Sequence, residues 1–184
     1  MSNTDTVRVL AISGSLRKAS SNSALVSAAV RVAPNGVEVS VYGELAEVPP
    51  FNPDLDTDRA PIGVVRFRAA LEAADALLIC SPEYAHGVSG VLKNALDWIV
   101  GSGELTDKPI ALVNASGRAT LAYASLRETL TTMSGHVVED ASVTIPLDGS
   151  RSDVATIAQD SHLSGLLKAS LAVLARVARL GAVR

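Results

Sequence analysis

Short apolar runs alternate with longer helical segments along this chain, and that alternation constrains its fold more than any other feature. The runs at residues 7–13, 74–80 and 109–116 are mostly apolar, which is typical of strands buried on both faces of a sheet. Between the runs, apolar residues recur every three or four positions, as at residues 25–30. Strands that alternate with helices predict a parallel sheet with helices on both of its faces.

We expect five strand–helix units. The expected strands are residues 7–13, 37–42, 74–80, 109–116 and 136–145, and the expected helices contain residues 25–30, 64–74, 91–99, 126–133 and 163–177. Five such units predict an α/β fold of the flavodoxin-like type, a three-layer sandwich whose five-stranded parallel sheet has the order 2-1-3-4-5. Because the chain has no internal repeat or linker, residues 1–184 are expected to form a single domain.

Ligands of such sheets bind beyond the carboxyl ends of the strands, near the point where the winding reverses. The loops after the first, third and fourth strands, at residues 14–21, 82–89 and 116–120, are therefore the candidate binding loops. Little regular structure is expected in the proline- and aspartate-rich segment 49–61, and the segment "PEYAHGVSG" at 82–90 is expected to be a loop.

Charge and residue usage exclude several classes of partner. The net charge of −3 and the scattered basic residues predict no nucleic-acid partner. No run approaches the ~18 apolar residues of a membrane span, and Cys80 is the single cysteine, so we expect a cytoplasmic protein without disulfides or membrane association. The histidines, His86, His136 and His162, are too far apart in the sequence to form a metal-binding motif, and no metal is expected.

The loop "SGSLRKASSN", residues 13–22, has the composition of a phosphate site. It joins the end of a strand to the start of a helix, where free backbone N–H groups and the positive end of the helix dipole converge. Its serine hydroxyls and Asn22 add donors, and Arg17 adds a planar cation that matches phosphate oxygens. Gly14 is expected to allow a tight turn of the backbone.

Other phosphate chemistries do not match this loop. With Gly14 as its only glycine, the loop lacks the G-x-G-x-x-G fingerprint of dinucleotide-binding folds and the Walker A pattern of ATPases. It also lacks the cysteine nucleophile of a phosphatase. A serine hydrolase is a weak alternative, because no G-x-S-x-G pentapeptide occurs anywhere in the chain.

Two longer segments resemble the signatures of the NADPH-dependent FMN reductase family, which includes quinone, chromate and azo-compound reductases. "GSLRKASSNSAL" at 14–25 is similar to the first signature, and "SPEYAHGVSGVLKNALDW" at 81–98 is similar to the second. "LVNASG" at 112–117 and the pair Leu126 and Arg127 fit a third region. The resemblance extends from Val7 to about Ile145.

The resemblance implies non-covalently bound FMN, NADPH or NADH as electron donor, and a small electron acceptor such as a flavin, quinone, chromate or azo compound. Electrons would pass in pairs by a ping-pong route, and because FMN carries the chemistry no catalytic side chain is expected. A homodimer or a dimer of dimers is implied as well. The residues implied to bind the cofactor are Ser13, Ser15, Leu16, Arg17, Ser20, Ser21 and Asn22 at the phosphate, Pro82, Glu83, Tyr84 and Ala85 at the ring, and Ser116 and Gly117 at its other edge, with His86 as a candidate substrate contact.

The chain departs from the family pattern at three places near the implied ring. Ala85 stands where the family often has Asn, residues 87–89 replace a segment that usually carries proline, and the loop that begins at Ser116 lacks the usual paired glycines. These departures bear on substrate access. Two alternatives to a reductase stay open: a flavodoxin-like electron carrier, against which Arg17 and the 3% aromatic content weigh, and an FMN-binding redox sensor without significant turnover.

Overall fold

A parallel sheet forms the centre of the molecule in a computed structural model, which describes residues 6–147 and 153–181. The strands run in the order β2-β1-β3-β6-β7, and every pairing between neighbours is parallel. Their bounds are β1 (Val7–Ser13), β2 (Val37–Tyr42), β3 (Ala76–Cys80), β6 (Pro109–Asn114) and β7 (His136–Val137). Because β6 and β7 correspond to the fourth and fifth expected strands, this is the expected order 2-1-3-4-5, and the expected topology is confirmed.

The fifth expected strand, residues 136–145, is wrong as a single strand. It divides into β7, a short 3-10 turn η3 (Glu139–Ala141) and β8 (Val143–Thr144), which pairs with the end of β6. At the interruption, the backbone amide of Leu112 in β6 donates to the Ser142 hydroxyl, at 3.0 Å, instead of to a carbonyl of a neighbouring strand. A side chain thus replaces the missing backbone acceptor, and the chain rejoins the sheet where the Ile145 amide donates to Asn114.

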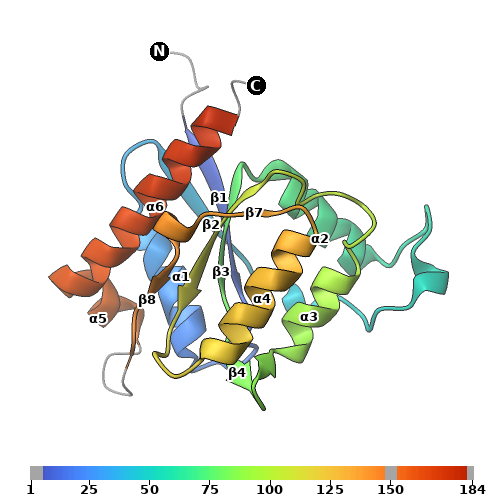
Figure 1. Cartoon of the computed structure of the whole chain (residues 1–184), viewed down its shortest axis with the longest axis horizontal. Helices are drawn as coiled ribbons and strands as arrows, with labels where there is room; N and C mark the ends of the chain where they lie inside the picture. Colours follow the sequence, from blue (N-terminus) through green and yellow to red (C-terminus); the bar gives the residue numbers. More distant parts are fainter. Residues whose placement is uncertain (1–5, 148–152, 182–184) are drawn as a thin grey trace.

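Helices cover both faces of the sheet, as expected for a three-layer sandwich (Figure 1). One face carries α1 (Ser21–Val32), α5 (Val154–Gln159) and α6 (Ser161–Gly181), and the other carries α2 (Ile62–Ala73), α3 (Gly90–Asp97) and α4 (Thr120–Thr132). The short helix α5 was not expected from the sequence; Asp153 caps it by accepting from the amides of Ala155 and Thr156. None of the described helices is long and apolar enough to cross a membrane.

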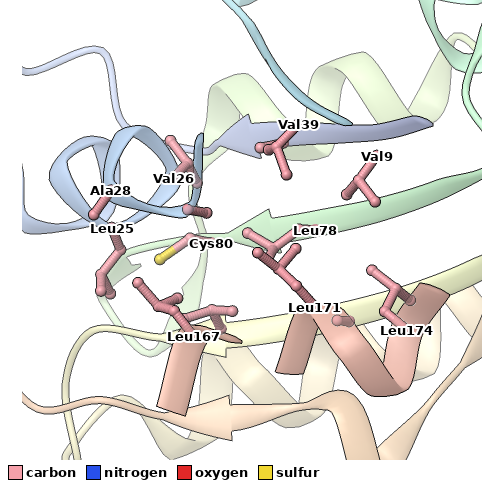
Figure 2. Close-up of a cluster of buried hydrophobic side chains, with 14 of the residues drawn as sticks. Val9, Leu25, Val26, Ala28, Val39, Leu78, Cys80, Leu167, Leu171 and Leu174 are labelled. Carbon is pink, nitrogen blue, oxygen red and sulfur yellow. The ribbon is translucent and has the colours of Figure 1, made fainter. Parts of the chain in front are cut away.

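The core consists of two apolar clusters, one on each face of the sheet. Val9 and Leu78 point toward α1 and α6, where they join Leu171 (Figure 2), while the neighbouring residues Leu10 and Leu77 point to the opposite side. Strand β3 is buried at every residue, which confirms the expectation of strands covered on both faces.

The two connections expected to be irregular contain short regular elements. The segment between β2 and α2 holds the 3-10 turns η1 (Leu45–Glu47) and η2 (Pro53–Leu55). Within residues 82–90, β4 (Glu83–Tyr84) and β5 (Gly87–Val88) form an antiparallel hairpin, so the expected plain loop is wrong. Ala85 and His86 form its two-residue turn, with φ angles of 49° and 62°. Both angles are in the left-handed region, as is typical of the type I′ turns that close two-residue β-hairpins.

Candidate functional site

Three loops meet at the carboxyl edge of the sheet and enclose a cavity of about 350 Å³. They follow β1, β3 and β6, which are the three loops that the sequence selected as candidate binding loops. The volume of this cavity lies in the usual range for small-molecule binding sites. The residues that line it are Ser21, Asn22, Ser81, Pro82, Glu83, Asn114, Ala115, Ser116, Arg118, Ala119 and Leu147.

The N-terminus of α1 supplies unpaired donors to this cavity. Ser20 is the N-cap, and its hydroxyl accepts from the Ser23 amide at 3.4 Å. The backbone N–H groups of Ser21 and Asn22, which begin the helix, have no acceptor among the described residues. Two free N–H groups at the positive end of a twelve-residue helix favour an anion, and a phosphate group matches them.

The hydroxyls of the preceding loop mostly hold the loop itself. Ser13 Oγ lies 3.0 Å from Ser23 Oγ, and Ser15 Oγ accepts from the Arg17 amide at 3.3 Å. The Arg17 Nε donates to the Ala19 carbonyl at 2.8 Å, which fixes the exposed guanidinium against its own loop. Its two terminal amino groups have no partner in the part of the chain that the structure describes, and they are available to a ligand.

The residues implied to bind the cofactor therefore divide between two hollows. Ser21, Asn22, Pro82, Glu83 and Ser116 line the cavity between the three loops. Four others line a second hollow, of about 380 Å³, between the first loop and the end of β2; they are Ser13, Ser15, Leu16 and Arg17. Ser20, Tyr84, Ala85, His86 and Gly117 line neither, although Gly117 and the hairpin residues adjoin residues of the first cavity.

The side chain of Asn22 points into the core rather than into the cavity. Its Oδ1 accepts from the Cys80 thiol, with 3.1 Å between the oxygen and the sulfur. Complete burial raises the pKa of the Cys80 thiol from 9.0 to about 12, so the sulfur stays protonated and Cys80 serves as a packing residue in the core (Figure 2). What Asn22 offers a phosphate is its backbone N–H.

The backbone bends at Gly14, and the missing side chain of this residue also allows close packing. Its φ is not in the left-handed region, whereas a Cβ at this position would lie 2.9 Å from both Ser81 Oγ and Ser89 Oγ. The first loop thus lies directly against the end of β3 and the start of α3. A side chain at this position would have to displace the hydroxyls of Ser81 and Ser89 and would lie 3.2 Å from the Ser81 Cα.

Glu83 contacts both neighbouring elements of the site. One carboxylate oxygen accepts from the Ala122 amide in the first turn of α4 at 2.8 Å, and the other lies 3.2 Å from His86 Nδ1. The hydrogen bond from Ala122 lowers the pKa of Glu83, and the bond with His86 lowers it further against the opposing effect of desolvation. Tyr84 and His86 lie at the exposed rim, with 58% of Tyr84 accessible to solvent.

Sequence reasoning missed Asn114, which shapes the third loop. Its Oδ1 accepts from the Ser116 amide and its Nδ2 donates to the Ala119 carbonyl, each at 3.0 Å, and only 7% of the residue is exposed. A polar residue at the end of an otherwise apolar strand was the signal that could have found it. Arg118 was missed as well, and it lines the cavity.

These donors fit FMN better than a metal. No group of three His, Cys, Asp or Glu side chains in the described ranges is placed to bind a metal ion. The free N–H groups of Ser21 and Asn22 and the open guanidinium of Arg17 suit a phosphate. The cavity beside them extends between the hairpin and the third loop, where a flat ring would fit.

Comparison with known proteins also points to an FMN-dependent family. Residues 7–149 match the family described as NADPH-dependent FMN reductase. An NAD(P)H-dependent FMN reductase of Pseudomonas aeruginosa is 40% identical over 146 residues, which cover 77% of this chain and 78% of that protein. A probable NADPH:quinone oxidoreductase of Oryza sativa is 42% identical over 117 residues, which cover 60% of this chain and 57% of the rice protein.

Solved structures agree with the fold. FerB, a flavoenzyme NAD(P)H:(acceptor) oxidoreductase from Paracoccus denitrificans, superposes with a TM-score of 0.79 at 26% identity, over 95% of this chain and 98% of its own. A WrbA-like flavodoxin from Agrobacterium tumefaciens is 18% identical with a TM-score of 0.53, over 96% and 98% of the two chains. The second likeness shows the fold alone, and it is the flavodoxin-like fold that the strand order predicts.

Proposed function

Because the chain belongs to the NADPH-dependent FMN reductase family, we propose that it is an NAD(P)H-dependent oxidoreductase that holds FMN between its three loops. When bound, FMN supplies the two-electron chemistry that links a nicotinamide donor to a small acceptor. The observation that carries this assignment to the cavity is the pair of N–H groups at the start of α1 that lack an acceptor among the described residues; Arg17 of the same loop lines the adjoining hollow.

The first loop would bind the phosphate. The N–H groups of Ser21 and Asn22 donate to it from the helix terminus, and Arg17 adds charge-assisted donors from the outer side. Ser13, Ser15 and Ser20 act through the loop: their hydroxyls hold its backbone in a shape that leaves those N–H groups open. Leu16, 57% exposed, adds an apolar side chain at the loop's tip.

The other two loops would border the ring. Pro82, Glu83, Tyr84 and Ala85 present the hairpin on one side, and Ser116 and Gly117 present the third loop on the other. Glu83 lines the cavity, but one of its carboxylate oxygens accepts the Ala122 amide and the other lies 3.2 Å from His86 Nδ1, so we assign it no proton-transfer role. The chain's own contribution is to bind, orient and partly exclude water.

The exposed rim of the site suits a substrate that approaches from solvent. Tyr84 and His86 project at the hairpin tip, and Arg118 lies across the cavity. We propose that donor and acceptor use this opening in turn. The family resemblance supports a flavin, a quinone, chromate or an azo compound as acceptor, and the rice relative is named for a quinone.

Association into a homodimer or a dimer of dimers and a cytoplasmic location are further parts of the proposal. Exposed apolar side chains on η2 and α2, namely Leu55, Ile62 and Val65, support the first. The continuous packing of both core clusters around one sheet supports a single domain over the described residues.

The proposal is tested by reconstitution and turnover. Purified protein incubated with FMN and passed through a desalting column is expected to retain one FMN per chain, released by denaturation. The loaded protein is then assayed with NADPH and NADH against FMN, quinones, chromate and azo dyes. Oxidation of a nicotinamide that depends on an acceptor supports the enzyme; a flavoprotein that no nicotinamide reduces would instead be a carrier or a sensor.

A further inference from the structure

We propose that Glu83 is a positioning residue, whose carboxylate joins the β4–β5 hairpin to the N-terminus of α4 and so sets the distance between the two loops at the flavin ring. The inference rests on the proposed function, because it assigns to these two loops the task of bordering the ring. It begins from the two contacts of the carboxylate, 2.8 Å to the Ala122 amide and 3.2 Å to His86 Nδ1.

Helix α4 lacks a cap of its own. Its N-cap residue, Ala119, has no side chain that accepts a hydrogen bond, and its first turn contains no acidic residue. Helices α1 and α5 differ, because Ser20 and Asp153 cap them from the adjacent position. Glu83 therefore supplies to α4, from 39 residues earlier in the chain, the negative charge and the acceptor that its own sequence omits.

The contact adds a hydrogen bond between two segments that also pack against each other, the hairpin and the start of α4. Asn114 braces the third loop from within, through Ser116 and Ala119. The hairpin is closed by its own short ladder around a turn of two residues at positive φ. Among the described residues, the only side-chain hydrogen bond between the hairpin and the segment from Ser116 to the first turn of α4 is the one that Glu83 accepts.

The same atoms place this link at the cavity. Glu83 and Ala119 line it, and only 14% of the Glu83 side chain is exposed. A carboxylate that holds one wall to the other keeps the opening at a fixed width. If the link is removed, the hairpin stays folded on itself and only packing holds it to α4, so a ring between the two walls is oriented less firmly.

The test compares Glu83→Gln and Glu83→Leu with a control variant, Glu128→Gln. Glu128 is exposed on α4, and its side chain has no hydrogen bond or ion pair among the described residues. The first readout is amide hydrogen exchange without added flavin. Exchange at residues 120–123 is expected to be faster in both Glu83 variants, more so in the leucine variant, and unchanged in the control. Unchanged exchange in Glu83→Leu would show that the contact does not hold the helix start.

The second readout separates positioning from simple capping. In the FMN-loaded proteins, Glu83→Leu is expected to raise the dissociation constant of FMN about tenfold, as loss of a charged hydrogen bond at the site would. It should also shift the visible flavin absorption and raise the KM for NADPH more than it lowers kcat. Glu83→Gln, which keeps an acceptor oxygen, is expected to fall between Glu83→Leu and the wild type.

Besides unchanged exchange in Glu83→Leu, two further results would overturn the inference, and they are distinguishable. Faster exchange with unaltered flavin absorption, FMN affinity and KM would reduce Glu83 to a helix cap. Failure of the wild-type protein to bind FMN would remove the proposed function itself, and it would be seen before any variant is compared.

Discussion

Several residues of this site have hydrogen-bond partners that their residue type alone does not predict. The serines of the first loop were expected around a phosphate, and the structure uses most of their hydroxyls to hold the loop. Asn22 was expected to offer its side chain, which instead meets Cys80 in the core. Sequence identified the residues of the loop because strand, loop and helix follow one another, but side-chain direction depends on contacts with distant strands.

Arg17 tests the phosphate assignment at this scale. Arg17→Ala is expected to weaken FMN binding by about 1.5–3 kcal/mol, the usual effect of losing a charge-assisted hydrogen bond. Fluorescence titration of the flavin-free protein measures it, with Arg31→Ala at the other end of α1 as control. Equal affinity in Arg17→Ala and the wild type would mean that the backbone N–H groups are sufficient.

Cys80 gives a prediction in alkaline solution. The pKa of its thiol is raised from 9.0 to about 12 by burial, so between these values the unfolded chain loses a proton that the folded chain keeps. Stability should therefore fall as pH rises above about 9, by at most about 1.4 kcal/mol per pH unit from this group. The free energy of unfolding, measured with urea between about pH 8 and 10, should decline more steeply with pH for the wild type than for Cys80→Ala. Parallel declines would contradict the raised pKa.

At the level of elements, the strands and helices with strong periodicity were predictable, and the elements fixed by distant contacts were not. Residues 136–145 read as one strand, yet the hydroxyl of Ser142 takes the ladder amide of Leu112 and a turn forms. The hairpin at 83–88 has too few residues for alternation to show. Its turn residues, Ala85 and His86, are not the Asn-Gly or Asp-Gly pair that usually marks such a turn, so the usual turn signal is absent.

Gly63 shows how tightly the elements pack. A Cβ at Gly63 would lie 2.1 Å from the Glu47 carbonyl oxygen, so α2 touches the backbone of η1. Gly63→Ala is expected to destabilise the protein by about 1–3 kcal/mol, as overpacking does. Gly165 in α6 has open space, and Gly165→Ala is expected to stabilise it by about 0.5–1 kcal/mol. Thermal unfolding of the two variants should shift in opposite directions; equal shifts would contradict this packing.

At the level of the whole molecule, the sheet brings three loops that lie far apart in the sequence to one edge. Strands β1, β3 and β6 are neighbours, so the residues after each of them face a common cavity. This convergence was predictable from the alternation of strands and helices. The width of the cavity was not, because it depends on Glu83 and Asn114, whose partners are set by the tertiary structure.

A flavin-dependent oxidoreductase must pass electrons from a nicotinamide through FMN to an acceptor, and this can be measured directly. Protein loaded with FMN is mixed anaerobically with NADPH or NADH, and the visible flavin absorption is followed before and after a quinone is added. We expect a nicotinamide to bleach the flavin and the quinone to restore its absorption, over repeated cycles. A bound flavin that neither nicotinamide bleaches would contradict this expectation.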